Sequence, residues 1–117
     1  MKIRHRIWLE EHGEAVYGPG RNKLFRMIEE GQSLNAAAKK IKISYSWVWG
    51  KIKDSEERLG INLVEVDYRK RGMHLTKEAK MLLKIFNDTE TEILPILKKA
   101  EKKFYSWKRR NAPKQKY

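Results

Sequence analysis

The segment that follows Ser44 holds the densest group of side chains able to recognise another molecule. On a helix with Val48 and Ile52 turned inward, the outer positions are Tyr45, Ser46, Trp47, Trp49, Gly50 and Lys51. Serine and lysine can hydrogen-bond base edges, while tyrosine and tryptophan can lie against sugars, phosphates or a thymine methyl group. Glycine permits close approach of the backbone. These residue types suit a helix that enters the major groove of duplex DNA, which is about 12 Å wide.

The two tryptophans need separate treatment, because packing is the ordinary role of aromatic residues at helical spacing. Residues 47 and 49 point about 200° apart on a helix, so both cannot be buried if Val48 is. We expect Trp47 to be exposed on the DNA-facing side. We expect Trp49 to be partly buried against an N-terminal hairpin or the first helix.

Serines and basic residues near this helix offer contacts to a DNA backbone. Ser33 and Ser44 are good N-caps, and a helix N-terminus binds phosphate, although simple capping accounts for both serines equally well. The surrounding cations are Lys39, Lys40, Lys42 and Lys53, and a later basic turn holds Arg69, Lys70 and Arg71. Any one of them can be an ordinary solvated side chain. We therefore predict DNA contact for the cluster and for the turn, rather than for each lysine.

The pattern contains no arrangement suited to catalysis or metal binding. His5, His12 and His74 are scattered, with no aspartate or glutamate at metal-ligand spacing. The chain has no cysteine, which excludes disulfides, thiolate metal sites and cysteine catalysis. The run 18–21 faintly resembles a phosphate loop, but it lacks the Gly-Lys-Ser/Thr ending and is interpreted as a linker. We predict no catalytic residue, no metal, no cofactor and no enzymatic activity.

Hydrophobic periodicity predicts the elements that position these residues. Residues 3–9 alternate with a period of two, which predicts a strand with one half-buried face. That face comprises Ile3, His5, Ile7 and Leu9. A turn at His12-Gly13 and a short strand over 15–17 complete an N-terminal hairpin, and the run Gly18-Pro19-Gly20 ends it.

The next segments predict a helix-turn-helix followed by a wing. Apolar residues three and four apart predict a helix over 22–30, a short helix over 33–41 and, after only two residues, a helix over 44–59 that Gly60 closes. Two helices joined by so short a turn are typical of a helix-turn-helix. The alternation over 62–67, the basic turn and a return strand over 73–75 predict the wing.

The longest predicted helix starts at Thr76 and runs to residue 107. Its apolar residues are spaced alternately four and three apart, which is the pattern of a helix that pairs with another helix. We expect a dimer interface formed by Ala79, Leu83, Phe86, Glu90, Ile93, Leu97, Ala100 and Phe104. Pro95 lies inside this helix at a cost of about 3 kcal/mol. Because the stripe keeps its register across Pro95, we predict one kinked helix.

The charge of the chain favours a polyanionic partner. The net charge is +12, from 27 Lys+Arg and 15 Asp+Glu in 117 residues. Residues 98–117 carry nine basic side chains against one acidic, Glu101. Residues 108–117 have no apolar period, and we expect them to be a disordered basic tail. No segment resembles a signal peptide or a membrane span, so we expect a cytoplasmic protein without a membrane partner.

The predicted fold class is therefore mainly α with a small β component (α+β). We expect one winged helix-turn-helix domain over 1–107, which includes the linker and dimerisation helix over 76–107, and a tail over 108–117.

The sequence resembles the N-terminal DNA-binding domain of the molybdate-responsive regulators of the ModE family. The residues that carry the resemblance are a hairpin beginning RIWLE, the GPGR linker, the S-x-x-A-A-A pattern from Ser33 and the S-Y-x-x-x-W pattern from Ser44. The continuation from ERLGINLVEV to MHLTKEAKMLL is similar to the wing and linker helix of both ModE and LysR-type regulators. The resemblance covers residues 3–86.

The resemblance implies a winged-helix dimer that places two recognition helices in successive major grooves of a pseudo-palindromic operator. The residues that match the family's pattern lie in three places. They are Ser33 and 36–38 in the second helix, Ser44, Tyr45 and Trp49 in the third, and Leu75-Thr76 before the last helix. The wing, over 67–73, is shorter than the Gly-rich wing of ModE. No molybdate-binding domain follows the linker helix in this sequence, so we do not expect molybdate sensing to carry over.

The main hypothesis is a homodimeric, sequence-specific regulator of transcription that binds double-stranded DNA. A weakly specific architectural or chromatin protein fits the charge and the bulky aromatic residues as well. A third hypothesis is an interaction module in which the long helix recruits a different protein.

Overall fold

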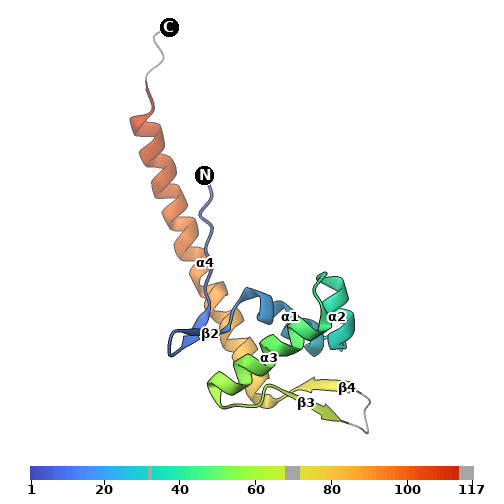
Figure 1. Ribbon diagram of the computed structural model, residues 1–117. Helices are drawn as coiled ribbons and strands as arrows, with labels where there is room; N and C mark the ends of the chain where they lie inside the picture. Colours follow the sequence, from blue (N-terminus) through green and yellow to red (C-terminus); the bar gives the residue numbers. More distant parts are fainter. Residues whose placement is uncertain (32, 68–71, 114–117) are drawn as a thin grey trace. The chain divides into compact units, whose positions relative to one another are not determined.

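The computed structural model of the protein describes residues 1–31, 33–67 and 72–113 (Figure 1). The chain divides into two compact units. One comprises Arg6–Phe86, and the other joins Met1–His5 to the chain from Asn87 onward. The elements that carry the candidate site all belong to the first unit.

The first unit is a winged helix-turn-helix. The chain forms a hairpin from β1 (Leu9–Glu11) and β2 (Glu14–Tyr17), then α1 (Pro19–Glu29), α2 (Leu34–Lys40) and α3 (Tyr45–Leu59). The wing follows as β3 (Val64–Asp67) and β4 (Gly72–Leu75), and α4 (Lys77–Asn111) begins directly after it. Each hairpin is a separate two-stranded antiparallel sheet. The predicted α+β class and the winged helix-turn-helix are confirmed.

The N-terminal hairpin is shorter than the alternation of residues 3–9 predicts. Only Leu9 of that run lies in a strand, and residues 1–8 have no regular structure. The prediction of a strand over 3–9 was wrong because a strand needs a partner. The return strand β2 ends at Tyr17, and Leu9 already pairs with Tyr17. The alternation instead records burial, since Ile3, His5 and Ile7 are half-buried and the residues between them are exposed.

The core of the unit lies where the three helices meet the hairpin and the wing. Tyr17 and Phe25 are completely buried, and Tyr17 makes edge-on ring contacts with Phe25 at 5.4 Å and with Phe86 at 5.2 Å between ring centroids. The Tyr17 hydroxyl donates to Oδ1 of buried Asn22 at 2.8 Å, so this large aromatic residue is buried with its polar end bonded. Helix α1 begins at Pro19, three residues before the predicted start, because proline suits the first helical position.

The ends of α2 and α3 follow the predicted caps. The Ser33 hydroxyl accepts from the Ala36 N–H at 3.1 Å, and the Ser44 hydroxyl accepts from the Trp47 N–H at 3.2 Å. Gly60 ends α3 with φ of +67°, a left-handed conformation that glycine adopts without steric cost.

A buried carboxylate joins α3 to the wing. Oε2 of Glu56 accepts from the backbone N–H of Leu63 at 2.7 Å and of Val64 at 3.2 Å, and its Oε1 lies 3.0 Å from the Lys53 ammonium. Burial alone raises the pKa of the Glu56 carboxyl, but the hydrogen bond from Leu63, then Lys53 and Val64, outweigh burial and lower the pKa overall. The start of β3 is thus tied to the last turns of α3.

Helix α4 differs from its prediction in the burial of its first residues and in its C-terminal end. Three residues of the predicted dimer stripe, Ala79, Leu83 and Phe86, pack in the core of the first unit and are at most 8% exposed, which leaves little surface for a second copy. The helix continues through Pro95 as predicted, but it ends at Asn111 rather than at residue 107. The first four residues of the predicted disordered tail are therefore helical, and residues 114–117 lie outside the described residues.

In the second unit the N-terminal residues lie along α4. The Ile3 N–H donates to Oε1 of Glu101 at 2.8 Å, and Nε2 of His5 lies 4.0 Å from Glu90. Within the part of the chain that the structure describes, no helix combines the length and apolarity that crossing a bilayer requires.

Replacing Glu56 with glutamine should destabilise the fold. The variant loses the charge that two buried N–H groups and Lys53 share, so we expect the free energy of unfolding to fall by about 1–3 kcal/mol at neutral pH. Because the folded pKa is lowered, the contribution of Glu56 is present above the unfolded pKa and disappears as pH falls through the folded pKa. The difference in free energy of unfolding between the wild-type protein and Glu56→Gln should therefore decrease in acid.

Urea unfolding over a range of pH measures this difference in free energy of unfolding. Glu57→Gln, which removes the same charge from an exposed neighbouring position, is the control and should change stability little. A gap that is the same in acid as at neutral pH would contradict this role of the Glu56 charge.

Candidate nucleic-acid interface

The first two turns of α3 separate into a buried face and an exposed face. Val48 and Ile52 have no exposed surface, whereas Tyr45 and Trp47 are 47% and 52% exposed. This agrees with the predicted orientation, including the exposure of Trp47. The predicted DNA-contacting residues that are exposed are Ser33, Lys42, Ser44, Tyr45, Ser46, Trp47, Gly50 and Lys53.

Two predicted residues of this group, Trp49 and Lys51, are half-buried. Trp49 packs against the hydrophobic core, as predicted. The Lys51 ammonium lies 5.1 Å from the centre of the Trp47 ring, an arrangement in which the cation is attracted to the aromatic face. The exposed Trp47 and the half-buried Lys51 thus form one aromatic and cationic surface on α3.

The Lys53 ammonium contacts two other side chains of this protein. Its ammonium lies 4.6 Å from the centre of the Trp49 ring and 3.0 Å from Glu56. Because Glu56 neutralises much of this charge locally, Lys53 offers less attraction to a phosphate than Lys42, which has no such contact among the described residues.

The N-terminal hairpin braces α3 from behind. The Ser55 hydroxyl donates to the Val16 carbonyl at 2.6 Å, and both residues are completely buried. Nη1 of Arg58 donates to the Ala15 carbonyl at 2.7 Å, and its Nη2 lies 3.6 Å from Glu14. These contacts fix α3 at its C-terminal half, so the outer face of its N-terminal half is presented in one orientation.

Sequence reasoning missed this bracing. Ser55 interrupts the apolar face of α3 at a buried position, and a small hydroxyl residue there was the available signal. Arg58 gave none, since an arginine near a helix C-terminus is also stabilised by the helix dipole.

The turn between α2 and α3 places Lys42 at the edge of this surface. Lys42 adopts a left-handed conformation with φ of +59°, and the Ile43 N–H donates to the Ala38 carbonyl at 3.0 Å. The turn is therefore closed by backbone bonds, and Lys42 remains exposed. Lys39 and Lys40, in the last turn of α2, are exposed as well.

The strands of the wing are in register, with Val64 opposite Leu75 and Val66 opposite Met73. The predicted wing contacts Arg69, Lys70 and Arg71 lie outside the described residues.

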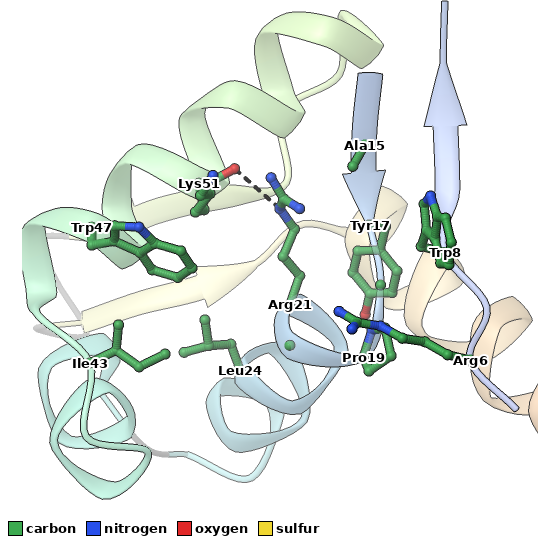
Figure 2. Close-up of a pocket in the computed structure, with 12 residues that line it drawn as sticks. Arg6, Trp8, Ala15, Tyr17, Pro19, Arg21, Leu24, Ile43, Trp47 and Lys51 are labelled. Atoms are coloured by element: carbon green, nitrogen blue, oxygen red, sulfur yellow. Dashed lines mark hydrogen bonds between the residues drawn. The ribbon is translucent and has the colours of Figure 1, made fainter. Parts of the chain in front are cut away.

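A cleft of about 510 Å³ opens beside the Trp47–Lys51 surface, between α3, the start of α1 and the segment before the hairpin (Figure 2). Arg21 lies in this cleft and its Nε donates to the Lys51 carbonyl at 3.3 Å. No sequence pattern predicted the cleft, because its lining residues come from distant positions.

Among the described residues, no group of three or more histidines, aspartates or glutamates is placed to hold a metal ion. The remaining residues of the predicted dimer stripe divide along α4. Glu90, Ile93, Leu97 and Ala100 are half-buried, and Phe104 is 50% exposed.

Comparison with known proteins identifies the sequence family of the first unit. The bacterial regulatory helix-turn-helix proteins of the lysR family match residues 21–80. No curated protein matches the chain. The matched span begins after the N-terminal hairpin and includes all of the helix-turn-helix and the wing.

Two solved structures are similar to this chain. The CbnR_DBD–DNA complex is 23% identical, covers 74% of this chain and 93% of its own, and has a TM-score of 0.50, which shows the fold alone. ArgP from Mycobacterium tuberculosis is 29% identical with a TM-score of 0.52, and the match covers 71% of this chain and 31% of ArgP. The matching family is the lysR family, and the ModE-specific part of the resemblance finds no support in these comparisons.

Two glycine substitutions in α3 should have opposite effects on stability. A Cβ at Gly50 meets no atom within 4 Å, so Gly50→Ala should raise the free energy of unfolding by about 0.5–1 kcal/mol through better helix propensity. Gly60→Ala should lower it by about 1 kcal/mol or more, because φ of +67° is unfavourable for alanine.

Thermal and urea unfolding of both variants measure the difference. A destabilising Gly50→Ala would mean that the outer face of α3 is packed against protein rather than open.

Proposed function

Since this chain belongs to the lysR family of bacterial regulatory helix-turn-helix proteins, we propose that it regulates transcription by binding duplex DNA sequence-specifically as a homodimer. The observation that carries the proposal is the two-sided character of α3. Val48 and Ile52 are fully buried behind a half-exposed Trp47. A helix held in this way can enter a major groove without disturbing its own core.

The proposed base contacts come from the outer face of α3. Ser46 and Lys51 supply hydrogen-bonding groups for base edges, and Trp47 and Tyr45 supply apolar surface for thymine methyl groups and sugars. Gly50 is an exposed position without a side chain, and it would let DNA approach the helix backbone closely. Trp49 packs behind and acts on DNA only through the position of α3.

The proposed phosphate contacts surround this face. The N-termini of α2 and α3, capped by Ser33 and Ser44, and the exposed Lys42 are suited to phosphates. Lys53 contributes less because Glu56 pairs with it. The basic turn at Arg69, Lys70 and Arg71 is proposed as a wing contact, and the C-terminal cations as a source of sequence-independent affinity.

Replacing Lys51 with glutamine should weaken binding to the preferred sequence, which selection from a random duplex pool identifies. We expect a loss of about 1–3 kcal/mol on that sequence and a much smaller loss on random duplex, because a base contact carries specificity. Lys80→Gln removes the same charge from an exposed position on α4 and should leave the sequence preference intact.

Fluorescence anisotropy at fixed salt measures both losses. A preferred-to-random affinity ratio below about tenfold would instead favour the alternative, an architectural protein that coats DNA through its +12 charge. Equal losses on both duplexes for Lys51→Gln would remove Lys51 from the base contacts.

The proposed dimer uses the part of α4 that lies beyond the core. On one face of this part lie Phe104 and Trp107, which are 50% and 56% exposed. Phe104 and Trp107 border an apolar hollow together with Ala100 and Lys103. Apolar surface of this extent on one helix is typical of a contact with another chain. Dimers of helix-turn-helix proteins bind two half-sites about one helical turn apart, or a multiple of it.

Replacing Phe104 with glutamate should produce a monomer. A charge placed in an apolar interface loses hydration without a partner, so we expect weaker self-association and a footprint reduced to one half-site. Lys102→Gln changes the net charge by the same amount at a neighbouring exposed position and is the control. Sedimentation velocity over a range of concentrations measures both; an unchanged oligomeric state for Phe104→Glu would exclude Phe104 from the interface.

A further inference from the structure

The cleft beside α3 has the composition of a ligand site. Three cations line it, Arg6, Arg21 and Lys51, and no acidic residue does. Its remaining walls are largely apolar, from Trp8, Tyr17, Pro19, Leu24, Ile43 and Trp47. Figure 2 shows Arg21 between Trp47 and Lys51 on one side and Arg6 and Trp8 on the other. Its volume of about 510 Å³ is within the usual range for small-molecule sites.

The two tryptophans leave unusually large aromatic surface open. Trp8 is 53% exposed and Trp47 is 52% exposed. The indole N–H of Trp8 donates to Oε1 of Glu10 at 2.7 Å. The Gly18 backbone passes close to the Trp8 Cβ, since a Cβ on Gly18 would lie only 3.2 Å from it. These two contacts favour the orientation in which Trp8 lines the cleft.

Arg21 is the cation at the centre of this cleft, and it is short of negative charge. It is half-buried, and no carboxylate lies within ion-pair distance of it among the described residues. Burial, then the charge of Arg58, lowers the pKa of its guanidinium, and Asp54 offsets this only in part. Helix α1 also starts here without a side-chain N-cap, so its positive end adds to the field. An anion bound here would balance the positive charge of Arg21.

We propose that this cleft binds a small organic anion with a flat apolar body, such as an aromatic carboxylate. The carboxylate pairs with Arg21, with Arg6 and Lys51 nearby, and the flat body lies against Trp8 and Trp47. Seven of the twelve lining residues lie within 6–20 and so precede the matched span 21–80. The site is thus a feature that the N-terminal segment adds to the helix-turn-helix.

The site shares Trp47 and Lys51 with the proposed DNA-contacting face. A ligand held by these two side chains and DNA therefore compete for them, so each weakens the binding of the other by the same factor. This second step rests on the proposed function, whereas ligand binding itself does not.

NMR of the isotope-labelled full chain without DNA tests the site. Naphthoate is the probe, and naphthamide, its uncharged amide, is the matched control ligand. We expect naphthoate to shift the indole N–H resonances of Trp8 and Trp47 saturably and to leave that of Trp107, on α4, in place. Naphthamide should bind about tenfold more weakly or worse, because it lacks the charge that Arg21 pairs with.

Variants that each remove one positive charge test which cations bind the carboxylate. Arg21→Gln should weaken naphthoate binding by about tenfold or more. Arg6→Gln, at an exposed position that cannot disturb the core, should weaken it to a smaller degree. Lys23→Gln removes the same charge from an exposed position on α1 outside the cleft and should change nothing. Equal binding of naphthoate and naphthamide, or an equal shift of the Trp107 signal, would overturn the proposal.

DNA titrations with and without saturating naphthoate test the competition. The affinity of the wild-type protein for duplex DNA should fall, and that of Arg21→Gln should not respond to naphthoate. Ligand binding with an unchanged DNA affinity would overturn the competition alone. No naphthoate binding, combined with a loss of DNA affinity in Arg6→Gln, would assign the cleft to DNA instead. Failure of DNA binding altogether would overturn the proposed function and leave the NMR result standing.

Discussion

The complete burial of Val48 and Ile52 is the constraint on which the candidate site depends. Each of these side chains contributes about 1.5–3 kcal/mol when it is removed from water. A rotation of α3 by one residue, about 100°, would turn both away from the core and bring a tryptophan and a charged lysine in their place. The rotational position of α3 is therefore set by the core, and Trp47, Ser46 and Gly50 are exposed as a consequence.

Apolar packing sets the rotation of α3, and polar contacts then fix its position relative to the hairpin and the wing. Ser55 and Arg58 attach its C-terminal half to the carbonyls of β2, and Glu56 attaches it to the start of β3. A buried hydrogen bond adds only about 1 kcal/mol net, but it costs more when broken, because the partner is left unpaired. These contacts therefore define geometry more than they add stability, and they hold the hairpin and the wing against the same helix.

The sequence allowed the helix-turn-helix to be predicted closely, since its boundaries depend on local chemistry. Ser33, Ser44 and Gly60 act within a few residues of themselves. Features that depend on distant partners were not predictable in the same way. The alternation of residues 3–9 was interpreted as a strand although no partner strand reaches it, and one apolar stripe on α4 serves the core at Phe86 and is exposed at Phe104. A periodicity shows that a face is apolar, but not what covers it.

The cleft shows the same limitation most clearly, because Arg6, Arg21 and Lys51 come together only when the N-terminal segment folds against α1 and α3. That segment contacts α3 through β2, where the Val16 carbonyl accepts from the Ser55 hydroxyl, and α1 contacts α3 through Arg21 at the Lys51 carbonyl. A ligand can shift α3 only if it binds one arrangement of these contacts better than another. Nε of Arg21 already donates to the Lys51 carbonyl, so an anion bound to the other nitrogens of this guanidinium would lie next to α3. In the proposed site, the cation that would receive the ligand is therefore one that already contacts α3.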